Sequence, residues 1–208
     1  MRVERATRYA EREFAAGDVE IISAAAGSRF DAGGPGFGAL VHAVLAATLS
    51  ADTIIVKAAD ADAVNAEAAN AEALNAEAVN AETVNLATSN VEDLARMHAR
   101  VLGCSPEDAT AAAARVTAAF THDFFIRVKA AKQVRCESPV THRLPDGTMI
   151  EGVIDLAFEE SDGWVIADFK TDREIESRLD VYRRQVALYV NAIHALTGRP
   201  ARGVLVRV

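Results

Sequence analysis

The sequence predicts an α/β fold in which a small mixed sheet is flanked by helices. Three short apolar runs with strand character follow one another in its second half, a long helical pattern follows them, and an aliphatic strand closes the chain. The predicted elements are strands at 133–140, 148–159 and 163–169, a helix at about 174–197 that ends at Gly198, and a strand at 203–208. Together with a preceding helix, this order is typical of an α/β sandwich.

The first half of the chain is predicted to be mostly helical. Ser105 is a natural N-cap because Pro106 follows at the first helical position and Asp108 lies in the first turn. A cluster of glycines around Pro35 predicts a loop. The predicted elements are helices at 1–16, 39–47, 91–103 and 106–132, with a break at 27–38 that is a loop over 31–38.

A five-residue repeat occupies residues 63–90, with units such as Leu74-Asn75-Ala76-Glu77-Ala78. Five is the period of neither a helix nor a strand, so the aliphatic positions would spiral around a helix. A pentapeptide-repeat β-solenoid is one interpretation, but such solenoids need several stacked coils. The alanine-rich composition favours a helical or partly disordered insertion at 52–93 within one domain covering 1–208.

The acidity of the chain is concentrated in that insertion. The formal net charge is −8, and the nine acids and one base between Asp52 and Asp93 account for all of it. The other 21 acids and 21 bases cancel, so the total charge argues only against a strong stand-alone nucleic-acid binder. No 18-residue apolar run, no signal-peptide pattern and only two cysteines predict a cytoplasmic protein without a membrane span.

Two strand-like runs end by presenting acids. The first is Glu151–Leu156 with Asp155, and the second is Val165–Thr171 with Asp168 and Lys170. Residues i and i+2 of a strand share a face, so Asp168 and Lys170 project together while Phe169 turns into the core. Two carboxylates and an ammonium at one end of a sheet suit metal-dependent phosphodiester hydrolysis. The alternative is an ordinary hairpin with surface charges.

The flanking residues decide between these interpretations. Gly-Val-Ile-Asp-Leu, the hairpin, Asp-Phe-Lys-Thr-Asp and then 182–189 (Tyr-Arg-Arg-Gln-Val-Ala-Leu-Tyr) occur in an order and spacing that resemble the nuclease domain of the RecB/AddA family. That family belongs to the PD-(D/E)XK superfamily and usually forms the C-terminal domain of UvrD-type helicase–nucleases. The resemblance covers residues 133–208 and, more briefly, 33–50, but not the middle of the chain.

The resemblance implies a restriction-endonuclease-like αβββαβ core and a divalent-metal site. Asp155 and Asp168 match the family's metal-binding carboxylates for Mg²⁺, with Mn²⁺ also plausible, and the backbone carbonyl of Phe169 matches a further ligand. Lys170 matches the catalytic lysine. Without the resemblance, Lys170 would be interpreted as a surface lysine paired with Asp168.

Two further positions match possible ligands. The segment Gly36–Leu45 resembles the family's first motif, in which a histidine, here His42, reaches the metal. A histidine within an apolar helix is otherwise usually a packed core residue. Glu137 matches an acidic position on the first core strand, where it would bind metal through water, hold Lys170, or be an ordinary edge-strand glutamate.

The same resemblance predicts contacts to DNA from the last long helix. Gln185 and Tyr189 lie four residues apart on one helical face, and the family uses these positions near the cleaved strand. Arg183 and Arg184 are candidates for phosphate contacts. The alternative is a helix packed by its tyrosines, with a solvated glutamine. The remaining histidines show no partner spacing and are expected to be structural or surface residues: His98, His122, His142 and His194.

The expected activity is therefore that of a Mg²⁺-dependent DNA nuclease. The resemblance implies an exonuclease on single-stranded DNA, fed by a helicase motor during double-strand-break repair and recombination. The chain contains no Gly-x-x-x-x-Gly-Lys-Ser/Thr loop, so the motor is expected in a larger polypeptide or a separate partner. The alternatives are a catalytically silent nuclease fold for structure or partner docking, and an interaction protein built on the 63–90 repeat.

Overall fold

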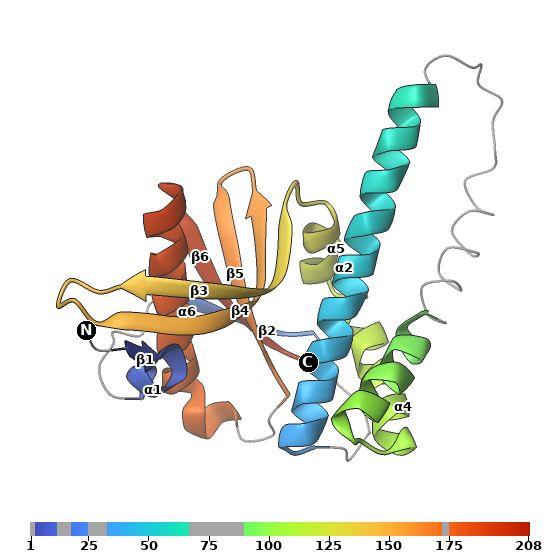
Figure 1. The fold of residues 1–208 in the computed structure, drawn as a ribbon, viewed down its shortest axis with the longest axis horizontal. Helices are drawn as coiled ribbons and strands as arrows, with labels where there is room; N and C mark the ends of the chain where they lie inside the picture. The colour runs from blue at the N-terminus through green and yellow to red at the C-terminus, as the bar shows by residue number, and fades with distance from the viewer. Residues whose placement is uncertain (1–2, 12–17, 25–32, 67–89, 172–174) are drawn as a thin grey trace.

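The structure is a computed structural model that describes residues 3–11, 18–24, 33–66, 90–171 and 175–208, without side chains for 51–66 (Figure 1). Its elements are β1 (Val3–Arg5), α1 (Ala6–Ala10), β2 (Val19–Ser23), α2 (Pro35–Ala66), α4 (Pro106–Ala119), α5 (Asp123–Lys129), β3 (Val134–Arg143), β4 (Met149–Glu160), β5 (Gly163–Lys170), α6 (Ile175–Thr197) and β6 (Ala201–Arg207). One more helix, at residues 90–102, precedes α4.

The sheet is six-stranded and mixed, as the sequence predicts. Its order is β1-β4-β5-β6-β2, with β3 paired along the other edge of β4. The β3–β4 and β4–β5 pairs are antiparallel, whereas β5–β6 and β6–β2 are parallel. The start of β4 pairs with β1, and only its last five residues pair with β5, so the middle of β4 lacks a partner on that edge.

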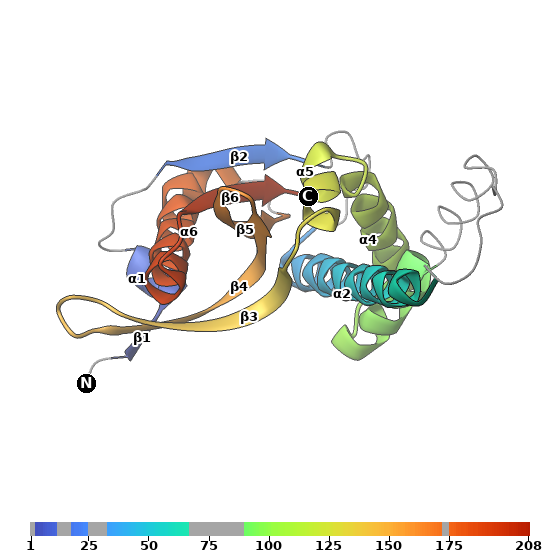
Figure 2. The same ribbon diagram turned by 90° about the horizontal axis from the view of Figure 1, so that it is seen from above.

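Helices cover both faces of the sheet (Figure 2). On one face α2, α4 and α5 pack over the sheet through Leu40, Leu45, Phe124 and Phe125, all fully buried. On the other face α6 and α1 pack through a second set that includes Leu188 and the alanines of α1. The side chains of β5 alternate between the two faces, which explains its almost continuous burial.

The predicted strands and the last helix are present as β3, β4, β5, α6 and β6, with ends that differ by a few residues. Strands β1 and β2 were not predicted, and the predicted helix at 1–16 is wrong at Val3–Arg5, which is a strand. Only Ala6–Ala10 is helical, while 12–16 lies outside the described residues.

Two helix boundaries also differ from the prediction. The predicted loop over 31–38 is wrong from Pro35 onward, because α2 begins there, and proline suits a first helical position. The predicted helix 106–132 is two helices, since His122 caps a new one by accepting from the Phe124 amide. The predicted cap at Ser105 is confirmed as a capping box with Asp108.

The acidic segment 52–93 begins as part of a helix. Residues up to Ala66 continue α2, and residues 67–89, which hold most of the repeat, lie outside the described residues. Whether the repeat forms a solenoid or a simple insertion therefore stays a prediction. None of the described helices combines the length and apolarity needed to cross a membrane.

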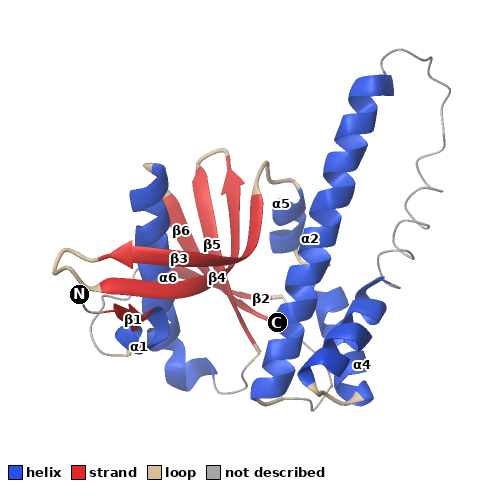
Figure 3. Cartoon of the chain, viewed as in Figure 1, coloured by secondary structure: helices blue, strands red, loops and turns tan. Residues whose placement is uncertain are grey.

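β3 and β4 are longer than their neighbours and extend past the sheet as a hairpin (Figure 3). Their register runs from Val134↔Phe158 to Arg143↔Met149, and Gly147 closes the tip with a φ of 85°. Because the hairpin and α2 leave the sheet in different directions, the middle of β4 lies open between them (Figures 1 and 3).

Candidate active site

The site begins where β4 and β5 separate. The last paired rung between them is Leu156↔Ala167, and the next rung would join Asp155 to Asp168. Instead, the Asp155 side chain enters the gap, and its Oδ2 accepts a hydrogen bond of 2.8 Å from the Phe169 amide. The carboxylate thus satisfies a backbone donor that the diverging strand no longer satisfies.

Glu137 lies opposite Asp155 on the other side of β4. The rungs on either side, Cys136↔Leu156 and Ser138↔Ile154, are paired, but the rung between them is not. Glu137 has a φ of 47°, the one positive value for a non-glycine residue in the described chain. This conformation costs about 1–3 kcal/mol and is typical of functional sites. The residue itself was predicted from its motif, whereas its backbone conformation has no signal in the sequence.

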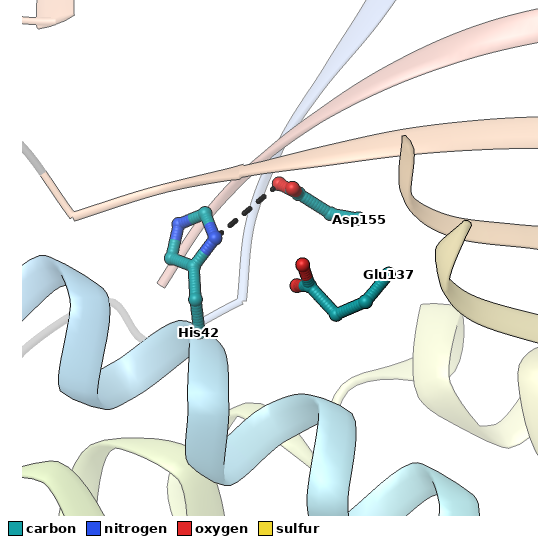
Figure 4. A group of neighbouring side chains, drawn as sticks. All are labelled: His42, Glu137 and Asp155. Atoms are coloured by element: carbon teal, nitrogen blue, oxygen red, sulfur yellow. Dashed lines mark ion pairs between the residues drawn. The ribbon is translucent and has the colours of Figure 1, made fainter. Parts of the chain in front are cut away.

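His42 reaches the same place from α2 (Figure 4). Its Nδ1 lies 3.5 Å from Asp155 Oδ2, and one donor atom each from His42, Glu137 and Asp155 lie within 4.8 Å of one another. Carboxylate oxygens with one imidazole nitrogen fit a divalent cation such as Mg²⁺ or Mn²⁺. The predicted reach of His42 to Asp155 is thus present, and Glu137 joins this group rather than Lys170.

Asp168 and Lys170 lie beside this group but form a pair of their own. Asp168 is 2% exposed, and its Oδ2 contacts Lys170 Nζ. Phe169 between them turns into the opposite core, as expected from strand alternation. The Lys170 ammonium also lies 4.7 Å from the centre of the Tyr182 ring, a contact that the sequence did not predict. Asp168 is not part of the three-residue group, and its role as a ligand stays a prediction.

The charges at the split favour an ionised Asp155 beside a protonated histidine. Burial alone would raise the pKa of Asp155, but the His42 hydrogen bond and charge, Lys170 and the Phe169 amide together lower it. Burial alone would lower the pKa of His42, but Asp155 raises it above its usual value. This electrostatic environment also suits a bound cation, which would take the place of the proton on His42.

The two other carboxyl groups shift in the opposite direction. Burial raises the pKa of Asp168 to about 6, although Lys170 opposes that shift. Burial and the nearby Asp155 charge raise the pKa of Glu137. Neighbouring acids with separated pKa values are common in sites where carboxylates have different roles.

Gln185 and Tyr189 are buried rather than presented to solvent. Gln185 Nε2 donates to the Tyr189 hydroxyl at 3.3 Å, and the two residues are 8% and 3% exposed. Burial raises the pKa of Tyr189 to about 12, and the charges of Asp168 and Asp155 add to this shift. The alternative of a solvated glutamine is therefore wrong. The pair lies behind the two acids, and its contact with DNA stays a prediction.

The other predicted contacts are not assembled around the site. Arg184 Nε donates to the Asp180 carbonyl of its own helix at 3.0 Å, and Arg183 is half-buried on α6. Phe169 lines the site, but the described contacts involve its amide rather than its carbonyl. Phosphate binding by the arginines and metal binding by the carbonyl both stay predictions.

A pocket of about 750 Å³ opens beside the split. Its walls come from α2, β3, the end of β5 and the helix at 90–102, and they include His42, Glu137 and Lys170. Sequence reasoning missed two of its lining residues, His98 and Cys136. His98 had no partner spacing to reveal it, because it reaches the pocket from a helix that carries none of the motifs.

A strand split that carries opposed acids, an Asp-x-Lys pair and a histidine from a covering helix defines a hydrolytic nuclease as the class of protein. The sequence profile of the PD-(D/E)XK nuclease superfamily matches residues 10–208. The chain belongs to this superfamily, which confirms the resemblance read from its motifs.

Curated relatives agree over shorter stretches, and each of them is a large subunit of an ATP-dependent helicase/nuclease. The chain is 35% identical over 98 residues to the one from Heliobacterium modesticaldum, which covers 37% of this chain and 7% of that protein. It is 29% identical over 103 residues to its namesake from Desulforamulus reducens, covering 42% of this chain and 8% of that one. For Clostridium botulinum the identity is 43% over 53 residues, 24% of this chain and 4% of that protein. The matched segments thus span less than a tenth of these relatives.

Proposed function

We propose that this chain is a Mg²⁺-dependent deoxyribonuclease domain that degrades single-stranded DNA from an end. The observation that carries the proposal is the group of His42, Glu137 and Asp155 at the strand split, with the Asp168–Lys170 pair beside it. Membership of a nuclease superfamily supports hydrolysis of phosphodiester bonds. The names of the relatives support a DNA substrate and a helicase partner.

The roles of the residues follow from their contacts. His42, Glu137 and Asp155, joined by Asp168 according to the sequence motif, would hold the cation. When bound, Mg²⁺ supplies Lewis acidity toward a phosphate oxygen. Lys170 holds a positive charge at the pocket wall, where it would stabilise negative charge that develops on the phosphate.

Three side chains keep these groups in place. Asp168 and the Tyr182 ring fix the Lys170 ammonium from two sides, and the Phe169 amide fixes Asp155. Such fixed geometry lowers the cost of reorganisation during the reaction. Water enters through the open pocket, so the chemistry needs no closure of the domain.

We also propose that the domain works with a helicase motor in double-strand-break repair and recombination. The relatives are helicase/nuclease proteins many times longer than the matched segment, and this chain contains no P-loop motif. The motor would lie in another part of a polypeptide or in a separate partner, and the 52–93 segment would be an insertion in the nuclease domain.

A cleavage assay tests the activity. Wild type, Asp168→Asn, Lys170→Ala and the control His142→Ala, which lies on β3 away from the pocket, would be given end-labelled DNA with Mg²⁺, with Mn²⁺ or with EDTA. We expect wild type and the control to degrade linear single strands and to leave circular strands intact, with at least about a hundredfold loss in the other two. Equal degradation by all four would rule out this active site, and no cleavage by any would favour a silent nuclease fold.

The metal set has an independent test. Mg²⁺ or Mn²⁺ binding, followed by calorimetry or by the shift of the melting temperature, should weaken in His42→Ala and Glu137→Gln but not in His142→Ala. Unchanged affinity in both variants would remove His42 and Glu137 from the site.

A further inference from the structure

The pocket beside the cation-binding group has a wall that the proposed function leaves unused. That wall is the helix at 90–102, which contributes His98. The helix belongs to none of the motifs that define the nuclease. His98 is half-buried, and its side chain lines the same pocket as His42, Glu137 and Lys170.

The two histidines lie at a similar depth in this pocket. The Cys104 thiol, just after the 90–102 helix, meets the Gly36 carbonyl in the first turn of α2 at 3.7 Å. His98 precedes Cys104, and His42 follows Gly36, by the same number of residues, which is about 9 Å along either helix. Both side chains then face the pocket, so a ligand at the cation-binding group is within the span between the two helices.

His98 has no role in holding the fold that the described contacts reveal. Within the described ranges, its imidazole forms no hydrogen bond and no ion pair. By contrast, His42 contacts Asp155, His122 caps α5, and His194 contacts the Arg199 carbonyl at 2.7 Å. A half-buried imidazole with unused donor and acceptor capacity in a pocket is available to a ligand.

The floor of the pocket leaves room for that ligand. The face of α2 that lines it carries small side chains at Ala39, Ala43, Ala46, Ala47 and Ser50. Spacings of three and four place them on one helical face. The resulting volume of about 750 Å³ lies within the range of roughly 300–1,000 Å³ typical of small-ligand pockets. A nucleotide unit attached to the cleaved phosphate is a ligand of that size.

We propose that His98 is a further substrate-contacting residue, which donates a hydrogen bond to a phosphate of the DNA strand next to the cleaved bond. The small-residue face of α2 is the floor beneath that nucleotide. The proposal rests on the nuclease function and adds a second contact along the strand. A phosphate contact of this kind fixes the position of the strand without reading its bases.

Binding and turnover of a single-stranded oligonucleotide test the proposal. Dissociation constants would be measured by fluorescence anisotropy with Mg²⁺ in the Asp168→Asn background, and KM and kcat in the otherwise wild-type chain. We expect His98→Ala to raise Kd and KM about tenfold and to change kcat less than about twofold. His98→Gln, which keeps an N–H donor, should recover part of the affinity, and His142→Ala should behave as wild type.

A second variant tests the floor. Ala43→Leu removes no polar group but fills the pocket beside His98, so it should also raise Kd while the melting temperature stays within a few degrees. Because the contact is to a phosphate, oligo-dT and oligo-dA should lose the same factor in each variant.

The outcomes separate this inference from the nuclease function. If wild type cleaves DNA and His98→Ala binds and cleaves it equally well, His98 is not a substrate contact, and the nuclease function stands. A fall in kcat with unchanged Kd and KM would also overturn the inference. If wild type neither binds nor cleaves DNA, both proposals fail.

Discussion

Gly152 lies beneath the ring of Tyr189. A Cβ at this position would be 2.5 Å from the Tyr189 hydroxyl oxygen and 2.8 Å from Cε1, distances that atoms in a folded protein do not adopt. The glycine of the Gly-Val-Ile-Asp motif therefore has a packing role: it lets Tyr189 of α6 lie flat against β4 three residues before Asp155.

A substitution at this contact should lower stability. Gly152→Ala would displace a buried ring in the second core, so we expect a loss of about 1–3 kcal/mol in the free energy of unfolding, measured by urea denaturation. Gly36→Ala is the matched control, since nothing lies within 4 Å of its Cβ position, and it should leave stability unchanged or slightly raised. Equal stability of Gly152→Ala and wild type would contradict this account.

The buried Gln185 and Tyr189 show how far residue patterns extend. A spacing of four residues correctly predicts a shared helical face, on which the two side chains form a hydrogen bond. It does not say what that face meets, because the answer depends on which surface of the sheet α6 covers. Similarly, acidic Glu137 is visible in the sequence, whereas its positive φ is a result of the surrounding ladder.

At the scale of elements, the placement of His42 depends on how closely α2 approaches β5. A Cβ at Gly38 would lie 2.9 Å from Thr171 Oγ1, and His42 follows Gly38 by one helical turn. Glycine at this position therefore lets α2 carry His42 to the end of β5.

Gly38→Ala should push the helix from the strand and weaken the site without unfolding the protein. We expect kcat to fall about tenfold, because small displacements of catalytic groups are costly. Thr171→Ala removes the obstructing atom, so the double variant Gly38→Ala/Thr171→Ala should recover the rate of Thr171→Ala alone. Cleavage rates of the three variants and wild type form the test, and a double variant as slow as Gly38→Ala would contradict it.

The far end of the β4–β5 hairpin is held by charge. Glu160 accepts from Arg127 of α5 at 2.8 Å and from Arg202 of β6 at 2.6 Å. The Arg127 hydrogen bond, outweighing burial, and then Arg202 lower the pKa of Glu160. This pair of contacts joins a helix and two strands at one carboxylate.

The pH dependence of stability should report this carboxylate. Its pKa is lowered by folding, so its contribution is complete above the unfolded value of about 4.3 and is lost as pH falls through the lower folded value. Glu160→Gln should therefore be less stable than wild type at about pH 7, and the difference should shrink below about pH 4. Urea denaturation across that range measures it, with exposed Glu151→Gln as a control that should track wild type.

Elements with their own periodic pattern were predictable, and those that depend on a distant partner were not. The strands from β3 to β6 and helix α6 carry apolar patterns or caps that identify them. By contrast, Val3–Arg5 is a strand only because it pairs in parallel with the start of β4. Val19–Ser23 is likewise completed by β6, which follows it by nearly the whole length of the chain.

For the molecule as a whole, the acidic segment sets the long-range field. Without residues 52–93 the remaining charges cancel, although the active site must attract a polyanion. The repeat glutamates at 67, 72, 77 and 82 contribute −4 of the total of −8.

Replacing these four glutamates by glutamine should therefore tighten DNA binding. We expect several-fold stronger binding at low salt and a smaller difference at high salt, because exposed charges are screened. The same length of chain is kept, so a change that persists at high salt would point to a contact rather than to the field. Anisotropy titrations from roughly 20 to 300 mM salt, the range in which such effects appear, measure it.

The absent rungs at Asp155 have a consequence for local motion. At this level of the sheet neither β3 nor β5 completes its ladder with β4, so opening the strands here breaks fewer backbone hydrogen bonds than elsewhere. Amide hydrogens around Glu137 and Asp155 should exchange with solvent faster than those of the flanking rungs, and added Mg²⁺ should slow them. The weakest part of the sheet would then become one of its more protected parts when the cation binds.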